Sequence, residues 1–300
     1  MASPPRVIGL GELLWDVFPE GRKPGGAPAN VAFQAQQLGC CGTVVTRVGN
    51  DADGDELVAY LREKGLDVSA VQRDAEYPTG RVTVAMSDSG THTFTIHEQV
   101  AWDHLQLDDA TRHVLADAAA ICFGTLAQRS APSLATIQSV LDLAPATCLR
   151  VFDVNLRQQF YSREVIITSL QRAQVLKLNE DEVPIVGALL DWPTEPESFC
   201  RQVLAHTPVQ TACVTRGAQG CLLLSGDAVV DVPGIRVNVI DTVGAGDAFT
   251  AGLIVGLLHG WALSQVGQLA NRVGAMVAAS AGAMPQLDFA QLLVEVRGES

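Results

Sequence analysis

The regular alternation of strand and helix patterns in the first 65 residues is the feature that most constrains the fold. Short apolar runs at 6–11 and 42–49 have the composition of buried strands. Amphipathic segments at 30–39 and 53–65 follow them, and each ends in a glycine that is typical of a helix C-terminus. Because a crossover helix returns the chain to the same end of the sheet, such strands run parallel. The sequence therefore predicts an α/β fold, with a mostly parallel sheet covered by helices.

The same pattern returns after residue 118 and favours a single domain. Apolar runs at 118–124 and 148–155 are typical of buried strands, and 211–224 alternates as a β-hairpin does. The small residues of 270–284 predict a helix that packs closely against its neighbour. The chain has 300 residues, 48% of them hydrophobic, and no repeat or obvious linker. We therefore expect one domain over 1–300, with a core and a small appendage.

The segment 79–102 interrupts the α/β pattern. It contains two alternating β-rich runs around the turn Ser-Asp-Ser-Gly at 87–90. Such a hairpin has one apolar and one polar face and does not belong to a parallel core. Two interpretations remain open from these residues alone, a lid over a functional site or a plain edge hairpin.

Charge and cysteine content exclude several classes of protein. The net charge of −13 argues against a nucleic-acid backbone or an anionic membrane as the main partner. The seven cysteines are odd in number and form no C-x-x-C pair, which indicates reduced thiols in a cytoplasmic protein. The N-terminus lacks the features of a signal peptide. The longest nearly apolar run, 248–263, is shorter than the roughly 20 residues of a membrane span, so it predicts a buried helix.

A glycine-rich turn near the C-terminus is the strongest candidate for a functional site. Gly244, Ala245 and Gly246 lie between Asp241 and Asp247 and precede the long apolar segment. Small residues at a loop-to-helix junction expose backbone N–H groups at the positive end of the helix dipole, which together can hold an anion. A tight turn that feeds a core helix is the alternative. The turn is neither a Walker A loop nor a Rossmann fingerprint, since Phe249 stands where the latter needs its third glycine.

Asp247 gives this turn a specific chemical meaning. An acidic residue in the first turn of a helix is a common structural choice because it complements the dipole. Phosphoryl transfer to an alcohol, however, needs a group that accepts the hydroxyl proton and groups that neutralise the moving phosphoryl oxygens. Asp247 can accept the proton, and the N–H groups of Ala245, Gly246 and Asp247 can bind the phosphoryl oxygens.

Four motifs resemble those of the ribokinase-like (PfkB) carbohydrate kinases and stand in that family's order. DTVGAGDAFTAGL, from Asp241, resembles the C-terminal signature, and GGAPANVAFQAQQLG, from Gly25, resembles the N-terminal sugar-binding signature. NEDE at 179–182 and TRGAQG at 215–220 resemble the N-x-x-E motif and the nucleotide turn. The resemblance covers nearly the whole chain. It implies a Rossmann-like three-layer α/β/α core, a small β-sheet lid formed by about 12–24 and 79–102, and ATP-dependent phosphorylation of a sugar hydroxymethyl group.

The resemblance also implies roles for individual residues. Asp247 would be the catalytic base, with Gly244, Ala245 and Gly246 as the anion hole. Asn179 and Glu182 would organise the Mg²⁺–phosphate network, with Glu182 acting through water; a solvated helix start is the alternative for this motif. The positions implied for the nucleotide are Thr215, Gly217, Gly220 and, near adenine, Asn271. A potassium-type ion would lie behind the anion hole, at Asp241, Val243, Val277, Ser280 and Gly282.

The sugar side carries polar groups that can fix a polyol. A carboxylate accepts hydrogen bonds from two adjacent hydroxyls, and glycine allows close backbone approach. The positions that match are Asp16, Gly25, Gly26, Asn30, Phe94 and Arg157. Asn30 could instead be a helix N-cap and Asp16 an exposed turn residue. Arg157 could instead form an ion pair with Asp153.

The motifs resemble those of bacterial fructokinases most closely. Ribokinases usually carry Asn where this chain has Leu14, and GGKGAN where it has GGAPAN. We therefore expect fructose as the substrate. The alternatives are a kinase for 2-keto-3-deoxygluconate, ribose or a nucleoside, and a catalytically silent relative that binds nucleotide or sugar. The expected partners are the sugar, ATP and a second copy of the chain through the lid, although the short link 17–24 argues against a full lid.

Overall fold

Two sheets organise the chain in the computed structural model, which describes residues 3–86, 92–289, 292 and 295. The main sheet has the order β13-β12-β11-β10-β9-β8-β1-β4-β5, and the small sheet has the order β3-β2-β6-β7. In the main sheet the neighbours from β5 to β11 pair in parallel, while β12 and β13 are antiparallel. The main strands are β1 (Arg6–Leu10), β4 (Cys41–Gly49), β5 (Val71–Asp74), β8 (Ala118–Phe123), β9 (Leu149–Asp153), β10 (Val175–Asn179), β11 (Thr211–Thr215), β12 (Cys221–Ser225) and β13 (Ala228–Val232).

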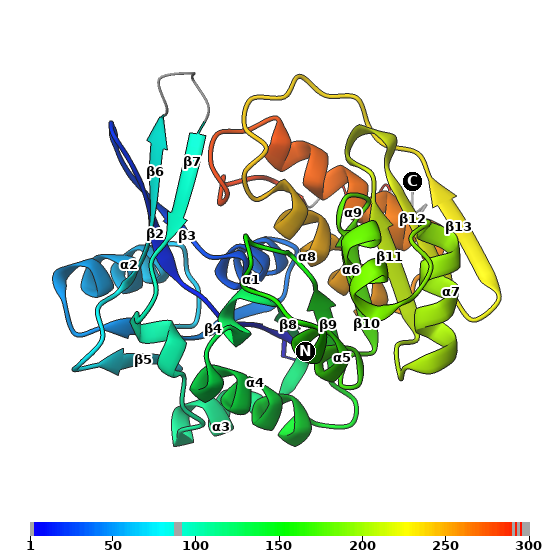
Figure 1. Cartoon of the computed structure of the whole chain (residues 1–300). Helices are drawn as coiled ribbons and strands as arrows, with labels where there is room; N and C mark the ends of the chain where they lie inside the picture. The colour runs from blue at the N-terminus through cyan, green and yellow to red at the C-terminus, as the bar shows by residue number, and fades with distance from the viewer. Residues whose placement is uncertain (1–2, 87–91, 290–291, 293–294, 296–300) are drawn as a thin grey trace.

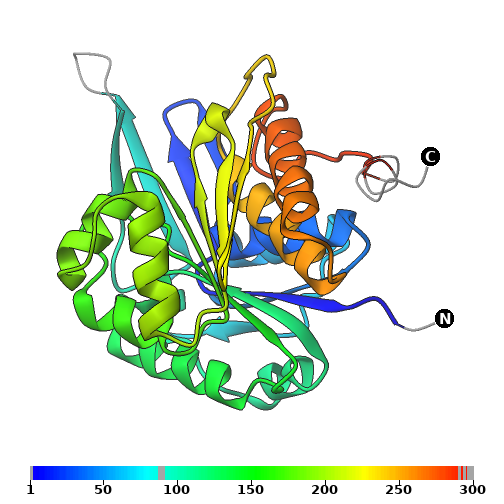
Figure 2. The ribbon, with the colours of Figure 1, turned by 90° about the vertical axis from the view of Figure 1, so that its right-hand side faces the viewer.

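Helices cover both faces of the main sheet and make a three-layer sandwich, seen along its edge in Figure 2. One layer contains α3 (Asp109–Leu115), α4 (Ala131–Leu143), α5 (Arg163–Leu170), α6 (Glu182–Leu190) and α7 (Pro196–His206). The other contains α1 (Ala27–Gln37), α2 (Ala52–Glu63), α8 (Ala245–Leu258) and α9 (Leu263–Ala278). The α/β/α architecture with a mostly parallel sheet is confirmed.

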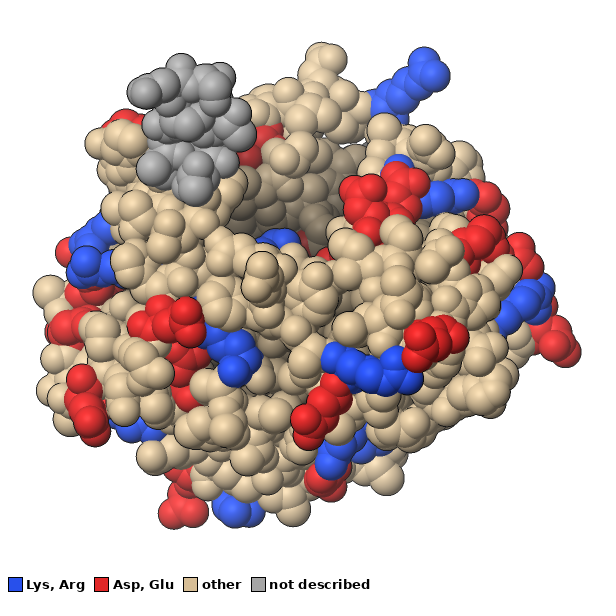
Figure 3. All heavy atoms as spheres, in the orientation of Figure 1, with Lys and Arg blue, Asp and Glu red and all other residues tan. Residues whose placement is uncertain are grey.

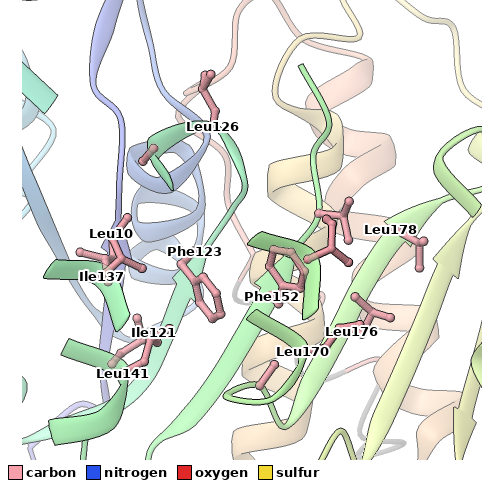
Figure 4. Packing of buried hydrophobic residues seen from close by; sticks show 14 of the residues in the cluster. Leu10, Ile121, Phe123, Leu126, Ile137, Leu141, Phe152, Leu170, Leu176 and Leu178 are labelled. Atoms are coloured by element: carbon pink, nitrogen blue, oxygen red, sulfur yellow. The ribbon is translucent and has the colours of Figure 1, made fainter. Parts of the chain in front are cut away.

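Strand alternation explains how one sheet supports two cores. Successive side chains of a strand point to opposite faces, so Phe152 joins the core under α4 and α5 while Val151 joins the core under α8 and α9. Phe123 and Phe152 stack in the first core with ring centroids 5.3 Å apart (Figure 4). Because both faces of the central strands are buried, functional groups can reach solvent only at the strand ends.

The small sheet stands apart from the main one, as Figure 1 shows. It consists of the hairpin β2 (Leu14–Phe18) and β3 (Gly21–Gly25), to which the hairpin β6 (Gly80–Met86) and β7 (His92–Ile96) adds through parallel pairing of β2 with β6. The predicted small sheet is therefore confirmed, while its function as a lid stays a prediction. The short link 17–24 closes the hairpin of β2 and β3 within this sheet. The predicted turn at 87–90 lies outside the described residues.

The base of the small sheet is tied to the core by one buried ion pair. Arg129 donates to both carboxylate oxygens of Asp103 over 2.7 and 2.8 Å and to the carbonyl of His97, where β7 ends. Its guanidinium lies 4.0 Å from the ring centroid of Trp102 and 4.7 Å from that of Phe160. Arg129 thus joins β7 to the loop that follows β9.

Three helix boundaries differ from the predictions. The apolar run 248–263 is not one helix, because α8 ends at Leu258 and Gly260 turns the chain with a φ of 67°. The second helix begins at Leu263 and ends at Ala278, so the predicted helix over 270–284 ends early in a loop. Among the described residues, no helix has the length and apolar character that crossing a bilayer requires.

Candidate active site

The candidate site lies where the carboxyl ends of β1, β9 and β10 meet the N-terminus of α8. Open parallel sheets bind ligands at this edge because loops and helix N-termini converge there. Figure 3 shows the molecule hollowed between the small sheet and the core, with acidic and basic atoms at the edge of the hollow. Motifs from both halves of the chain meet at this edge.

The glycine-rich turn has the geometry of an anion site. Gly244 is the N-cap of α8 with a φ of 78°, and a Cβ there would lie 2.6 Å from Ala283, so this position requires glycine. Ala245 donates its N–H to the carbonyl of Thr242 over 3.2 Å. Within the described part of the chain, the N–H groups of Gly246 and Asp247 have no protein acceptor. Two of the three predicted amides are therefore free to bind an anion.

Asp247 shares this cleft with Asn30. The Nδ2 of Asn30 donates to Oδ2 of Asp247 over 2.7 Å, and the carboxyl is partly buried. Burial raises the pKa of Asp247 to about 6, although Asn30, Lys177 and Arg157 oppose the rise. A carboxylate whose pKa lies near neutrality is suited to accept a proton under physiological conditions.

Asn30 lies inside α1, not at its N-cap. The cap is Gly26, with a φ of 126°, and Asn30 donates its backbone N–H to the carbonyl of that glycine. The N-cap alternative is therefore wrong. With Nδ2 committed to Asp247, the buried Oδ1 of Asn30 has no partner among the described residues. An unpartnered buried acceptor is costly, so this oxygen is suited to receive a ligand hydroxyl.

The two glycines of the N-terminal motif allow close packing beside the site. A Cβ at Gly25 would lie 2.4 Å from Oδ2 of Asp16, and one at Gly26 would lie 2.5 Å from the carbonyl oxygen of Glu12. Asp16 is a strand residue in β2 opposite Lys23, so the turn alternative for Asp16 is wrong. Burial raises the pKa of Asp16 to about 6, against the charges of Arg157 and Lys23.

Arg157 is exposed beside the site and does not pair with Asp153. It donates to the carbonyl of Leu156 over 3.2 Å, while Asp153 binds Lys177, so the ion-pair alternative is wrong. Gln158, the next residue, donates to the carbonyl of Phe94 over 2.6 Å and links this loop to the small sheet. The side chain of Phe94 is 53% exposed. These contacts bring the predicted sugar-side residues to one end of the cleft.

Asn179 and Glu182 form a reciprocal cap at the start of α6. Oδ1 of Asn179 accepts from the N–H of Glu182 over 2.9 Å, and the Glu182 carboxylate accepts from the N–H groups of Asn179 and Leu156. Among the described residues, no cluster of three or more His, Cys, Asp or Glu side chains could hold a metal. Magnesium often keeps several waters and one or two carboxylates beside substrate phosphates, and Glu182 fits that arrangement.

The nucleotide-side residues lie in the turn after β11 and on α9, and of these only Asn271 lines a second hollow. Gly217 and Gly220 have φ values of 52° and 92° in the turn after β11, where Thr215 ends the strand. Asn271 on α9 donates to the carbonyls of Val232 and Pro233 over 3.3 and 3.1 Å. A cavity of about 690 Å³ lies beside it between the 232–237 loop and α9. Its lining includes Pro233, Ile235, Val237, Gln268, Asn271, Ala275 and Met276.

Asp241 connects the two loops behind the anion turn. Its Oδ1 accepts from the N–H of Val243 over 3.0 Å and its Oδ2 from the N–H of Gly282 over 3.1 Å. The hydroxyl of Ser280 donates to the carbonyl of Met276, and Val277 is buried. Of the predicted cation residues, Val277 therefore lies in the last turn of α9, and the others lie on the two loops that meet at Asp241.

Sequence reasoning missed two groups at the floor of the site. Glu12 is 4% exposed, burial raises its pKa to about 7, and its Oε2 has no partner among the described residues. Lys177 is 6% exposed and binds Asp153. A charged residue inside an otherwise apolar strand pattern, as in Val-Leu-Lys-Leu, was the available signal.

Comparisons with known proteins agree with this geometry. The profile of pfkB family carbohydrate kinases matches residues 11–289. A fructokinase from Escherichia coli is 30% identical over 306 residues, which cover 96% of this chain and 98% of that protein. An uncharacterized sugar kinase from Pyrococcus horikoshii is 31% identical over 296 residues, which cover 92% of this chain and 91% of that protein.

Solved structures show the same likeness. The Pyrococcus horikoshii kinase in complex with ATP superposes with a TM-score of 0.83 at 29% identity, over 97% of this chain and 99% of that chain. A fructokinase from Vibrio cholerae, in a form with fructose, ADP and calcium ion bound, superposes with a TM-score of 0.77 at 26% identity, over 94% and 96% of the two chains. The fold and these matches define a phosphotransferase that acts on sugars. The chain belongs to the pfkB family of carbohydrate kinases.

Proposed function

We propose that this kinase transfers the γ-phosphoryl group of ATP to a hydroxymethyl group of fructose, with Asp247 as the general base. The observation that carries the proposal is the 2.7 Å hydrogen bond between Asn30 and Asp247, beside the free amides of Gly246 and Asp247. The base and the anion site therefore share one cleft. That is the arrangement that transfer to an alcohol requires.

Each protein group has a separate role in the transfer. The sugar hydroxyl donates a hydrogen bond to Asp247, which takes its proton as the hydroxyl oxygen attacks the γ-phosphorus. The bond from that phosphorus to the bridging β-phosphate oxygen breaks, and ADP leaves with the electron pair. The hydrogen bond from Asn30 holds the carboxylate in place, and the amides of Gly246 and Asp247 stabilise the negative charge on the transferred oxygens. Glu182, with Asn179, would hold Mg²⁺ through water, and the ion would supply further positive charge to the reaction. The lid excludes water from the cleft.

The nucleotide fits the turn after β11 and the cavity beside Asn271. The left-handed glycines Gly217 and Gly220 leave room for phosphates and ribose beside Thr215. The apolar side chains of Ile235 and Val237 line a cavity that suits an adenine ring. The known complex of the Pyrococcus kinase with ATP supports ATP as the donor.

Fructose is supported by two independent observations. The relatives compared above include fructokinases, one of them with fructose bound. The sugar end of the cleft contains Asp16, and beside it lie buried oxygens of Asn30 and Glu12 that have no partner among the described residues. Acceptor oxygens of this kind suit a neutral polyol, whose hydroxyls donate.

Arg157 favours one alternative, a sugar acid such as 2-keto-3-deoxygluconate. This arginine is exposed at the site, and its charge lowers the pKa of both Asp16 and Asp247. A guanidinium without a carboxylate partner can bind the carboxylate of an acid substrate. Ribose and nucleosides remain as further alternatives within the same chemistry.

A coupled ADP-release assay across a sugar panel tests the proposal. The panel contains fructose, ribose, 2-keto-3-deoxygluconate, adenosine and aminoimidazole riboside, and we expect the highest kcat/KM with fructose. Arg157→Met should leave fructose turnover within a few-fold, whereas selective loss with the sugar acid would favour the alternative. If none of these acceptors supports ADP release, the result would contradict the kinase assignment.

We also propose that a monovalent cation binds beside Asp241 and that two copies of the chain associate through the lid. Replacing K⁺ with tetramethylammonium at constant ionic strength should lower kcat, because the ion would order the loops that Asp241 joins. An unchanged kcat would contradict the proposal that a monovalent cation binds there. Sedimentation velocity distinguishes a dimer from a monomer.

A further inference from the structure

A buried polar network lies directly behind the anion turn. Lys177 on β10 donates to the two carboxylate oxygens of Asp153 on β9 over 3.0 and 3.1 Å. Thr250 on α8 donates to Oδ2 of the same aspartate over 2.7 Å and contacts the carbonyl of Gly246 at 3.0 Å. The network therefore connects two central strands to the first turn of the helix that carries Asp247.

This network is almost entirely removed from solvent. Lys177, Asp153 and Thr250 are 6%, 4% and 0% exposed. A buried ammonium is costly unless it is paired, and Lys carries three donors. Within the described residues, its only hydrogen-bond partner is Asp153, so at least one N–H direction remains open.

The ammonium of Lys177 lies close to the anion turn. A Cβ added at Gly246 would lie 3.6 Å from Nζ of Lys177, so the ammonium sits beside the glycine whose N–H is free. A positive charge here acts in a low-dielectric environment and attracts an anion held by the turn.

We propose that Lys177, Asp153 and Thr250 form a positioning network for phosphoryl transfer: it fixes the free amides of the anion turn through Thr250 and supplies positive charge beneath the transferred group. The inference rests on the proposed function, because it assigns the turn to the phosphoryl group. Asp153 has two roles, as counter-ion to Lys177 and as acceptor for Thr250. The network acts through the turn and does not exchange protons with the substrate.

The network also helps to set the acidity of Asp247. The charged and titratable groups that face Asp247 are Lys177 on β10, Asp153 on β9, Cys122 on β8, Arg157 in the loop after β9 and Glu12 after β1, and Asn30 on α1 binds it. The lysine lowers the pKa of Asp247 and Asp153 raises it. Removing one charge without the other should therefore move the acid limb of the pH profile.

Four variants and one control test the network. Lys177→Met and Asp153→Asn each remove one charge, and the double variant D153N/K177M removes both and leaves no unpaired buried charge. Thr250→Val removes the hydroxyl but keeps the β-branched shape. The matched control is Thr168→Val on α5, because the Thr168 hydroxyl also lies against the carbonyl four residues earlier, that of Glu164, but contacts no residue of the network.

The expected results separate positioning from simple stability. In the folded double variant kcat should fall by roughly 10²-fold, the effect of losing one donor at an oxyanion site. T250V should lower kcat about tenfold, the equivalent of one net hydrogen bond, with an unmoved pH profile, while T168V leaves kcat unchanged. The acid limb of kcat/KM should move to higher pH in K177M and to lower pH in D153N.

A binding measurement gives a readout that needs no turnover. ADP with aluminium fluoride mimics the transferred phosphoryl group, and it should bind the double variant at least tenfold more weakly than the wild type, while ADP alone binds equally. A folded double variant with wild-type kcat and wild-type aluminium fluoride binding would overturn the network. An inactive wild type that still shows the binding difference would refute the proposed substrates and leave the network supported.

Discussion

Asn30 and Asp247 are 217 positions apart in the sequence, yet Nδ2 of Asn30 donates to Oδ2 of Asp247 over 2.7 Å. The contact joins the first turn of α1 to the first turn of α8. Each residue belongs to a different motif of the sequence, and neither motif defines a site without the other. Their meeting point fixes where the acceptor hydroxyl must lie.

Replacing Asn30 with alanine tests this contact through pH. Asp247 has a pKa of about 6, so kcat/KM of the wild type should rise with pH through about 6 and level off above it, because the base must be ionised. The Asn30 bond lowers that pKa, so Asn30→Ala should move the acid limb to higher pH and raise the KM for the sugar. Stopped-time ADP assays from pH 5 to 9 measure both effects.

The control for this variant is Gln36→Ala. Gln36 also lies on α1 and its amide donates to the carbonyl of Lys64 over 2.9 Å, away from the cleft. It should leave the acid limb in place. If the acid limb of the kcat/KM pH profile lies at the same pH in N30A and Q36A, Asn30 does not influence the pKa of Asp247.

Arg129 should be important for stability because its ion pair with Asp103 is buried. Removing one partner of a buried pair costs about 3–5 kcal/mol, since the other charge is left unpaired. Arg129→Met should therefore lower the free energy of unfolding by roughly that amount in urea titrations. Arg129 also binds the carbonyl of His97 at the end of β7, so the affinity for the sugar should fall in R129M as well.

Arg172→Met is the matched comparison for R129M. Arg172 makes the same two-oxygen contact with Asp142, over 2.8 and 3.1 Å, but the two side chains are 25% and 56% exposed. Exposed pairs of this kind contribute about 0–1 kcal/mol. If R129M and R172M lose the same free energy of unfolding, burial does not decide how much an ion pair contributes to stability.

Glu12 should make stability depend on pH. Its pKa of about 7 in the folded protein lies above the ordinary value of 4.5, so the folded state binds this proton more tightly than the unfolded state. The stabilisation of the folded state that comes from the Glu12 proton is fully present below about pH 4.5 and is lost as pH rises to about 7. Glu12→Gln should therefore raise the melting temperature, relative to wild type, more at pH 8 than at pH 5.

Glu195→Gln gives the opposite case for the same measurement. Backbone N–H groups at the start of α7, that of Ser198 first, lower the pKa of Glu195. The stabilisation that the Glu195 carboxylate provides is already complete above pH 5. The melting temperature of E195Q should therefore lie below that of the wild type by nearly the same amount at pH 5 and at pH 8. A pH-independent difference for E12Q as well would contradict the assignment of a raised pKa to Glu12.

The fold could be predicted from the sequence because its signals are local. Strand and helix periods, with glycine stops such as Gly39 and Gly65, define the α/β pattern without any knowledge of tertiary contacts. Boundaries were less certain where one apolar run served two helices, since only the turn at Gly260 divides α8 from α9. The four-stranded small sheet also formed despite a short link, because a hairpin needs few residues.

The site could be predicted only in part. Motif residues such as Asp247 and Asn30 were identifiable because their spacing matches a known pattern. Glu12 and Lys177 were missed, since neither the loop residue after β1 nor a single charge in the apolar strand β10 indicates a site until its tertiary neighbours are known. Pairing between β9 and β10 sets Lys177 opposite Asp153, and no local pattern encodes that register.

Turnover of Asp247→Asn, with ATP binding measured in parallel, tests the central proposal most directly. Asparagine keeps the shape of the side chain but cannot accept the proton. We predict that kcat falls by roughly 10²–10⁴-fold, the usual contribution of a general base, while ATP affinity and the melting temperature stay near wild type. Near-normal turnover in this variant would contradict the account, because the hydroxyl proton would then have another acceptor.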